Sequence, residues 1–188
     1  MKIGVLALQG SIVEHLRMLR RCNVEAKIVK SPSDMDVDGL IIPGGESTTI
    51  GKLMKLYGLD EAIKKRHSEG MAIYGSCAGA ILMAKEIIDE KMPKLELMDI
   101  SIKRNNYGRQ VDSFETDLWV NGFDKTFRGV FIRAPVIKSY FNGSKIMSEF
   151  GNNPVMIQQD NLLVTTFHPE LTDDKRVHEH FIGMIKNS

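Results

Sequence analysis

The first half of the chain alternates short apolar runs with segments whose apolar residues recur at helical spacing. Apolar runs of strand length occupy residues 3–8, 26–29, 39–42 and 71–74. Helical patterns occupy residues 12–21 and about residues 48–57 and 59–69, with a further helix-like run at residues 80–86. Strands that alternate with helices predict an α/β fold, a three-layer, mostly parallel open sheet with helices on both faces.

The second half changes character after about residue 97. Short runs separated by turn residues lie at 97–102, 114–120, 129–132, 145–150, 155–158 and 162–166. This pattern predicts an antiparallel extension of the same sheet. A last helix is expected at about residues 173–186, with Thr172 as its candidate N-cap. Because no internal repeat or linker is visible, we expect residues 1–188 to form a single domain.

Composition narrows the class of protein further. The chain has 188 residues, of which 43% are hydrophobic, and 25 basic against 24 acidic residues leave a formal charge of +1. The sequence has no basic stripe, so a nucleic-acid partner is not expected. No apolar run approaches the roughly 20 residues that cross a bilayer, so no membrane association is expected. Two cysteines, Cys22 and Cys77, do not suggest a disulfide framework, and we expect a cytoplasmic location, where thiols stay reduced.

The most distinctive motif is Cys77, flanked by Gly75 and Gly79 where an apolar run meets a helix-like run. Glycines permit the sharp strand-to-helix turn on which α/β enzymes expose a nucleophile. A helix that begins at Ala78 would aim its free N–H groups at the sulfur and favour the thiolate. A lone cysteine is more often buried and inert, so the catalytic interpretation requires a base elsewhere in the chain.

His168 and Glu170 supply such a base and its orienting group. In an extended chain, residues two apart point to the same face, and Pro169 stiffens the link between these two. A carboxylate beside an imidazole fixes its tautomer and stabilises the imidazolium that forms when it takes a thiol proton. A His-x-Glu pair alone is equally typical of a surface strand. Together with Cys77 it forms a coherent set for acyl transfer through a thioester.

Two glycine-containing segments are expected near Cys77, because ligands of parallel sheets bind beyond the carboxyl ends of the strands. Gln9-Gly10 follows the first apolar run, and residues 43–49 follow the third. The backbone N–H groups of Gly44-Gly45, with that of Ala78, can receive an oxyanion. Alternatively, this segment is a simple turn or a phosphate loop, although it lacks the lysine of a P-loop.

Arginines are the candidate groups for a substrate carboxylate, which a guanidinium can bind in a bidentate manner. Arg104 and Arg109 lie in a polar stretch that can equally be a solvated loop. Arg133 ends an apolar run and can equally pair with a structural carboxylate. His178 and His180 are two apart on a helix and do not form a metal pair, His15 is assigned a structural role at most, and no metal site is predicted.

These motifs resemble the class I (triad-type) glutamine amidotransferases and, within them, the glutaminase subunits of pyridoxal 5′-phosphate synthase. The resemblance runs in order from Ile3 to about the last helix. It is carried by residues 4–10 with Glu14 and His15, residues 43–49, 75–79, 104–105, 108–110, 112–115, 131–135 and 166–172. Two departures, Tyr107 in place of Phe and Ser76 in place of the common Thr, remove no functional group.

The resemblance implies hydrolysis of L-glutamine to glutamate and ammonia. Cys77 would be the nucleophile, His168 the general base and acid, and Glu170 its orienting group. The positions that match the family's glutamine-binding and oxyanion sites are Gly45, Glu46, Ser47, Arg104, Ile132 and Arg133, with Gly45 and Ala78 at the oxyanion. No cofactor is implied. Ammonia would pass to a separate synthase subunit, which in the family forms a dodecameric barrel core.

Three other functions remain open from the sequence. One is a glutaminase of another pathway, such as that of imidazole glycerol phosphate synthase. A second is a non-catalytic regulatory partner, although all three triad residues are present. A third is a cysteine peptidase or stress-response protein of similar architecture, which would not need Arg104 and Arg133 for substrate.

Overall fold

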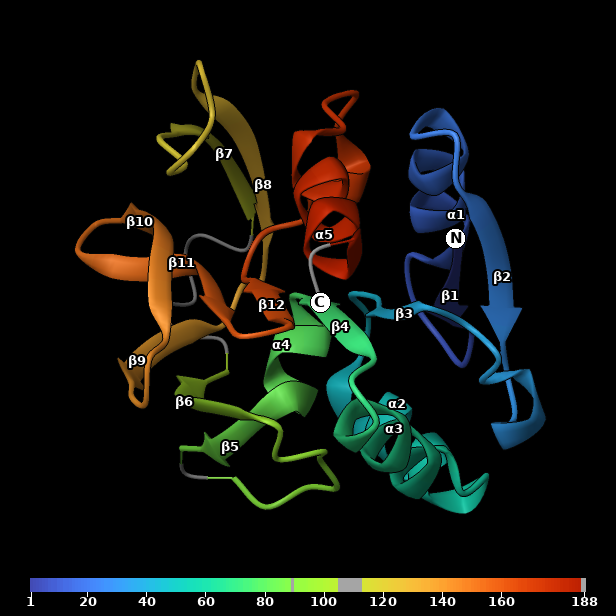
Figure 1. Cartoon of the computed structure of the whole chain (residues 1–188). Coiled ribbons are helices and arrows are strands. Elements are labelled where there is room, and N and C mark those ends of the chain that lie inside the picture. The colour runs from blue at the N-terminus through green and yellow to red at the C-terminus, as the bar shows by residue number, and fades with distance from the viewer. Residues whose placement is uncertain (89, 105–112, 187–188) are drawn as a thin grey trace.

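The central element is a seven-stranded sheet with strand order β10-β11-β12-β4-β3-β1-β2, seen in a computed structural model that describes residues 1–88, 90–104 and 113–186 (Figure 1). Strands β12, β4, β3, β1 and β2 pair in parallel, whereas β10 and β11 are antiparallel. The predicted mostly parallel sheet is therefore confirmed. The bounds are Lys2–Leu6 (β1), Glu25–Val29 (β2), Gly39–Ile42 (β3), Ala72–Ser76 (β4), Lys145–Phe150 (β10), Asn153–Gln159 (β11) and Leu162–Thr165 (β12).

Helices cover both faces of this sheet, as the alternation of strands and helices predicts (Figure 1). On one face, α1 (Ile12–Arg21) and α5 (Arg176–Lys186) pack against side chains such as Ile41. On the other face, α2 (Ser47–Leu56), α3 (Leu59–Ser68) and α4 (Ala78–Met83) pack against Leu40 and Ile42. Because successive strand residues point to opposite faces, β3 contributes to both cores. Within the described ranges, no helix is long and apolar enough to cross a membrane.

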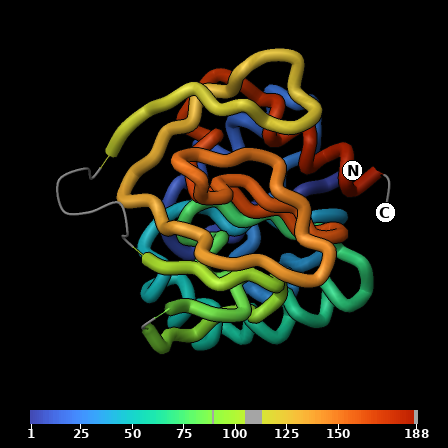
Figure 2. The backbone as a smooth tube through the Cα atoms, turned by 90° about the vertical axis from the view of Figure 1, so that its left-hand side faces the viewer, coloured from blue at the N-terminus to red at the C-terminus, as the bar shows by residue number. Residues whose placement is uncertain are grey.

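The second half of the chain extends the main sheet by β10 and β11 but also builds two smaller sheets, so the predicted single extension was wrong in part. One contains β5 (Ala84–Ile87), β6 (Met98–Lys103) and β9 (Val136–Tyr140), and the other is the hairpin of β7 (Ser113–Leu118) and β8 (Phe127–Ile132). Figure 2 shows the orange strands between the yellow hairpin and the green strands. Turn residues indicate where strands reverse but not which neighbour each one joins.

The helix-like run at residues 80–86 was predicted too long. Helix α4 ends at Met83, and Ala84 is extended, with φ −64° and ψ 142°. The N–H groups of Leu95 and Leu97 bond the carbonyls of Leu82 and Met83 at 2.7 and 2.9 Å. These long-range bonds satisfy the end of the helix and allow the next residues to pair with β6, which overrides their helical propensity.

The beginning of α5 also differs from the prediction. The helix starts at Arg176, and Thr172 is not its N-cap. Instead, the Thr172 hydroxyl accepts the N–H of Asp174 at 3.1 Å, and the Asp174 carboxylate accepts the N–H of Arg176 at 3.1 Å. Two short 3₁₀ turns, Pro32–Asp34 and Pro169–Leu171, complete the elements.

Candidate active site

Cys77 lies on a sharp turn between β4 and α4. Its backbone has φ 47° and ψ −99°, a conformation that non-glycine residues rarely adopt. The glycines around it are sterically required: a Cβ on Gly75 would lie 2.6 Å from the backbone of Gly79, and one on Gly79 would lie 2.1 Å from the Ile42 carbonyl. The turn that the flanking glycines predict is therefore present.

His168 and Glu170 follow β12 at the same edge of the sheet. His168 Nδ1 lies 2.8 Å from Glu170 Oε1, and the imidazole lines the same cavity as Cys77. Glu170 is fully buried. The Ser11 hydroxyl donates to Glu170 Oε1 at 2.6 Å, so this oxygen is held from two sides. The structure thus brings together thiol, imidazole and carboxylate in the order that acyl transfer needs.

Electrostatics at the site favour an ion pair between His168 and Glu170. Burial lowers the pKa of the His168 imidazole, but hydrogen bonds and charges from Cys77 and Glu170 outweigh burial and raise the pKa to about 10. Burial raises the pKa of the Glu170 carboxyl, but the imidazoles of His15 and His168 hold it well below its usual range. An imidazolium stabilised in this way suits a base that must accept a thiol proton.

The segment 43–46 lies directly over these side chains. A Cβ on Gly44 would lie 2.3 Å from His168 Cε1, so only glycine fits there. Gly44 N–H donates to Ser76 Oγ at 3.0 Å, and Glu46 N–H donates to Gln9 Oε1 at 2.7 Å. The N–H of Gly45, between them, donates no hydrogen bond to any residue that the structure describes. Gln9, which sequence reasoning placed at this edge, fixes the loop through its amide.

The cavity beside the thiol has a volume of about 190 Å³. Ten of the described residues line it, and one of them, Ile81, was not found from the sequence. The other nine were predicted as site residues: Gly45, Glu46, Ser47, Cys77, Ala78, Arg104, Ile132, Arg133 and His168. Glu170 lies behind His168, outside the lining. The residues come from five separate segments, so their meeting in one cavity is a property of the fold.

Arg104 and Glu46 form one polar wall of the cavity. The Arg104 guanidinium lies 3.4 Å from the Glu46 carboxylate, 3.2 Å from Thr48 Oγ1, and also pairs with Glu90. Glu46 is the N-cap of α2, and its carboxylate accepts the N–H groups of Thr48 and Thr49. The hydrogen bond from the Thr49 hydroxyl lowers the pKa of the Glu46 carboxyl to about 2, although partial burial raises it. Glu46 is thus anionic where it meets the cavity.

Arg133 also lines the cavity and has φ 43°, a left-handed conformation that is strained for this residue type. Its guanidinium makes no ion pair with any described residue, so the structural ion pair considered from sequence is not found there. The carbonyl of the adjacent Ile132 lies 4.0 Å from the Cys77 sulfur. Arg109 and the rest of residues 105–112 lie outside the described residues.

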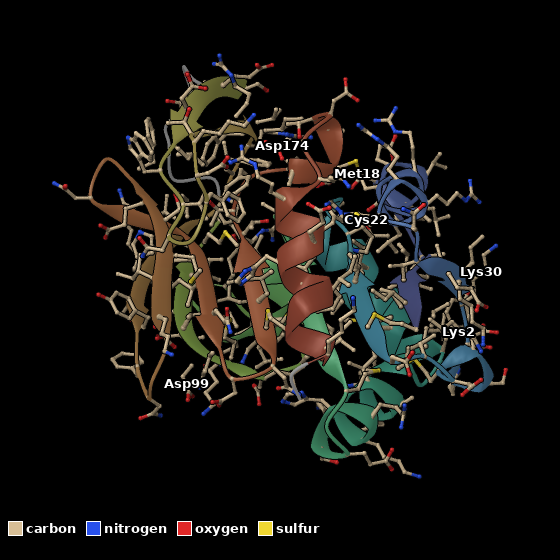
Figure 3. All side chains as sticks on the ribbon, turned by 45° about the horizontal axis from the view of Figure 1, so that its top comes forward. Lys2, Met18, Cys22, Lys30, Asp99 and Asp174 are labelled. Carbon is tan, nitrogen blue, oxygen red and sulfur yellow. The ribbon has the colours of Figure 1, made fainter. Side chains whose placement is uncertain are left out.

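Cys22 has the opposite character from Cys77. It is half-buried at the C-terminal end of α1 (Figure 3). Burial raises the pKa of its thiol, which opposes reactivity. His15 and His178, which the sequence pattern left without a functional role, are both fully buried, and His15 lies next to Glu170. In the described part of the chain, no three His, Cys, Asp or Glu side chains are grouped as metal ligands.

Comparisons with known proteins show which proteins share this fold and sequence. A crystal structure of a glutamine amidotransferase superposes with a TM-score of 0.94 at 45% identity, covering 98% of each chain. Pyridoxal 5′-phosphate synthase subunit PdxT of Thermosipho africanus is 47% identical, over 99% of this chain and 100% of that one. The subunit of the same name from Niallia circulans is 49% identical over the full length of both. The sequence profile of the SNO glutamine amidotransferase family matches residues 5–187.

The fold and the surroundings of the thiol therefore define a glutamine amidotransferase of the α/β type. More narrowly, the chain belongs to the SNO glutamine amidotransferase family.

Proposed function

We propose that this chain is the glutaminase subunit of a pyridoxal 5′-phosphate synthase, acting as one glutaminase domain over residues 1–188. It hydrolyses L-glutamine to L-glutamate and delivers the ammonia to a synthase subunit. The strongest support is the cavity in which Cys77, His168, Arg104 and Arg133 meet. The PdxT relatives described above carry the name of this synthase, which favours it over the glutaminase of imidazole glycerol phosphate synthase.

Substrate recognition is assigned by charge. The α-carboxylate of glutamine binds Arg133, whose guanidinium is unengaged by the described residues, with Arg104 as the second cation. The α-ammonium group faces the anionic Glu46. Ser47 and Ile132 complete the lining, so that the side-chain amide reaches the sulfur. A peptidase or a regulatory partner has no need for two arginines in the same cavity as a thiol.

The reaction proceeds in two halves. The Cys77 thiol gives its proton to His168, and the sulfur attacks the amide carbon, forming a C–S bond. The N–H groups of Gly45 and Ala78 bind the developing oxyanion. His168 then returns the proton to the amide nitrogen, the C–N bond breaks, and ammonia leaves a thioester. Water, deprotonated by His168, attacks the thioester, releases glutamate and restores the thiol. Glu170 stabilises the imidazolium in both halves.

The partner is the second half of the proposal. We infer that ammonia passes into a barrel-shaped synthase subunit, arranged as a dodecameric core, because the PdxT relatives are named as subunits of a synthase and the family resemblance implies such a partner. A thiol nucleophile requires reducing conditions, which fits a cytoplasmic complex. The chemistry uses side chains and backbone dipoles only, so no cofactor is required by the glutaminase.

Covalent labelling tests the nucleophile. A glutamine analogue that carries a diazoketone in place of the amide alkylates a nucleophilic thiol with loss of nitrogen gas. In the complex with the synthase subunit, peptide mapping by mass spectrometry is expected to place one adduct on Cys77, and excess glutamine should prevent it. Cys22→Ala should be labelled like the wild type, and Cys77→Ala should remain unlabelled. Labelling of Cys22 with none on Cys77 would contradict the proposal.

A further inference from the structure

A second pair of histidines lies behind the catalytic set and is not used by the mechanism above. His15 on α1 and His178 on α5 are both fully buried. His15 Nδ1 lies 3.0 Å from His178 Nε2, and the ring centroids are 5.2 Å apart. The ring of Tyr74 meets both imidazoles edge-on. Because buried polar rings need defined partners, the arrangement of protons on this pair is constrained.

His15 contacts both parts of the active site. Its Nε2 lies 3.1 Å from Ser76 Oγ and 3.5 Å from Glu170 Oε1. Ser76 directly precedes Cys77, and its hydroxyl oxygen accepts the N–H of Gly44 at 3.0 Å. A single imidazole nitrogen therefore faces the triad carboxylate and the residue that holds the loop over the cavity. The Ser11 hydroxyl donates to the same carboxylate oxygen at 2.6 Å.

The contacts decide which nitrogen of His15 carries the proton. A lone pair on Nε2 would face the anionic Glu170 and repel it, whereas an N–H there attracts it. With the proton of His15 on Nε2, its Nδ1 accepts, so His178 must donate from its Nε2. Burial lowers the pKa of His178 to about 3, so this ring is neutral. Its Nδ1 has no partner in the described residues, which suits a bare acceptor better than an orphaned N–H.

We propose that His15 is a positioning residue for Glu170 and for the 43–46 loop, and that His178 fixes the His15 tautomer which this role requires. The inference rests on the proposed function, because it assigns these rings to the glutaminase reaction. His15 donates toward Ser76 and Glu170 together. It thus keeps the carboxylate aligned with His168 and ties that alignment to the loop that presents the Gly45 N–H.

Steady-state kinetics of the complex with the synthase subunit test this role. His15→Leu keeps a similar volume but removes the donor, and should lower kcat for glutamine hydrolysis by about 10- to 100-fold, as expected for loss of a hydrogen bond to a charged group. KM should stay within about twofold, because His15 does not line the cavity. His15→Gln keeps an N–H at similar reach and should recover most of kcat. His180→Gln is the matched control: His180 lies on α5 like His178 but bonds Gln158, and this variant should behave like the wild type.

Equal loss in the leucine and glutamine variants, or a wild-type kcat in His15→Leu, would overturn the proposal. Nitrogen NMR of the histidine-labelled wild-type chain tests it without any variant: His15 should be protonated at Nε2 and not at Nδ1, and His178 at Nε2. A proton on His15 Nδ1 with none on Nε2 would equally overturn it. Absence of glutamine hydrolysis by the wild-type complex would instead contradict the proposed function, and the NMR result would still decide the tautomer.

Discussion

At the scale of single residues, hydrogen bonds from neighbouring segments hold the reacting groups in place. Cys77 N–H donates to the Thr165 carbonyl of β12 at 2.8 Å, and His168 N–H donates to the Val130 carbonyl of β8 at 2.8 Å. The strained backbone of Cys77 persists because these contacts fix the turn from outside. The thiol and imidazole are therefore arranged before substrate arrives, which lowers the cost of reaching the transition state.

Gly44 is the residue whose replacement should disturb this arrangement most selectively. In Gly44→Ala, the new Cβ would lie 2.3 Å from His168 Cε1, so the imidazole or the loop must move. We expect kcat for glutamine hydrolysis to fall by at least about tenfold, since overpacking costs roughly 1–3 kcal/mol.

The control is Gly183→Ala in α5, where a Cβ meets nothing within 4 Å. This variant should leave activity unchanged and stabilise the fold by about 0.5–1 kcal/mol in urea unfolding, because alanine favours helix. Normal kinetics in Gly44→Ala would mean that the loop does not rest on His168.

The raised pKa of His168 predicts how stability depends on pH. A histidine whose pKa rises from 6.5 to about 10 on folding stabilises the fold fully below pH 6.5 and loses this contribution as pH rises toward 10. The free-energy difference in unfolding between the wild type and His168→Gln should therefore shrink across that window. The pKa of Glu170 is lowered, so its contribution to stability is already complete above the usual carboxyl pKa near 4.5. Glu170 therefore does not change the pH dependence of stability between pH 6.5 and about 10.

Urea unfolding at about pH 6 and about pH 9.5 measures this difference. The matched variant His180→Gln should show no such narrowing, because burial lowers rather than raises the pKa of His180. A difference that stays level or grows with pH would show that His168 is not held as an imidazolium.

At the scale of elements, the beginning of α5 is fixed by one carboxylate. Asp174 accepts the N–H and the guanidinium of Arg176, whose guanidinium carbon lies 4.9 Å from the ring centroid of Phe123 (Figure 3). Burial raises the pKa of Asp174, but Arg176 outweighs it and the net pKa is lowered. The carboxylate thus caps the helix and holds the Arg176 guanidinium, which donates to the carbonyls of Lys125 and Thr126 in the loop before β8.

Asp174→Ala should destabilise the fold by about 1–2 kcal/mol, the usual cost of losing a helix cap, as measured by thermal or urea unfolding. The neighbouring Asp173→Ala removes only an exposed ion pair with Arg21 and should change stability by less than about 1 kcal/mol. Similar losses of unfolding free energy in the two variants would mean that apolar contacts alone, and not the Asp174 cap, fix where α5 begins.

Sequence patterns predicted the elements best where local and long-range forces agree. The helix over residues 12–21 and the strands over residues 39–42 and 145–150 are confirmed with the predicted bounds. Residues 84–86 were wrongly assigned to a helix, because pairing with β6 overrides their propensity. Strand β9 was missed, because Val136–Tyr140 follows a proline turn and is too short to show a periodic pattern.

At the scale of the whole molecule, the parallel sheet gathers the site. The loops after β1, β3, β4 and β12 meet at the carboxyl edge, as the fold class predicts. Cys77 and its cavity were therefore predictable from motifs and fold class. The buried contact between His15 and His178 was not, since it joins residues 163 apart on helices whose faces the sequence alone does not place together. Two histidines in separate helices give no local pattern to detect.

The central claim is that Cys77 hydrolyses glutamine for a synthase partner, and the rate of glutamate formation from glutamine tests it most directly. The wild-type chain should form glutamate slowly on its own and at least about tenfold faster with the synthase subunit. A tenfold change corresponds to a modest coupling free energy between the two sites. In Cys77→Ala, the rate of glutamate formation should fall by at least about a thousandfold both with and without the synthase subunit. This variant should still bind the partner. Glutamate formation by Cys77→Ala at the wild-type rate would contradict the account.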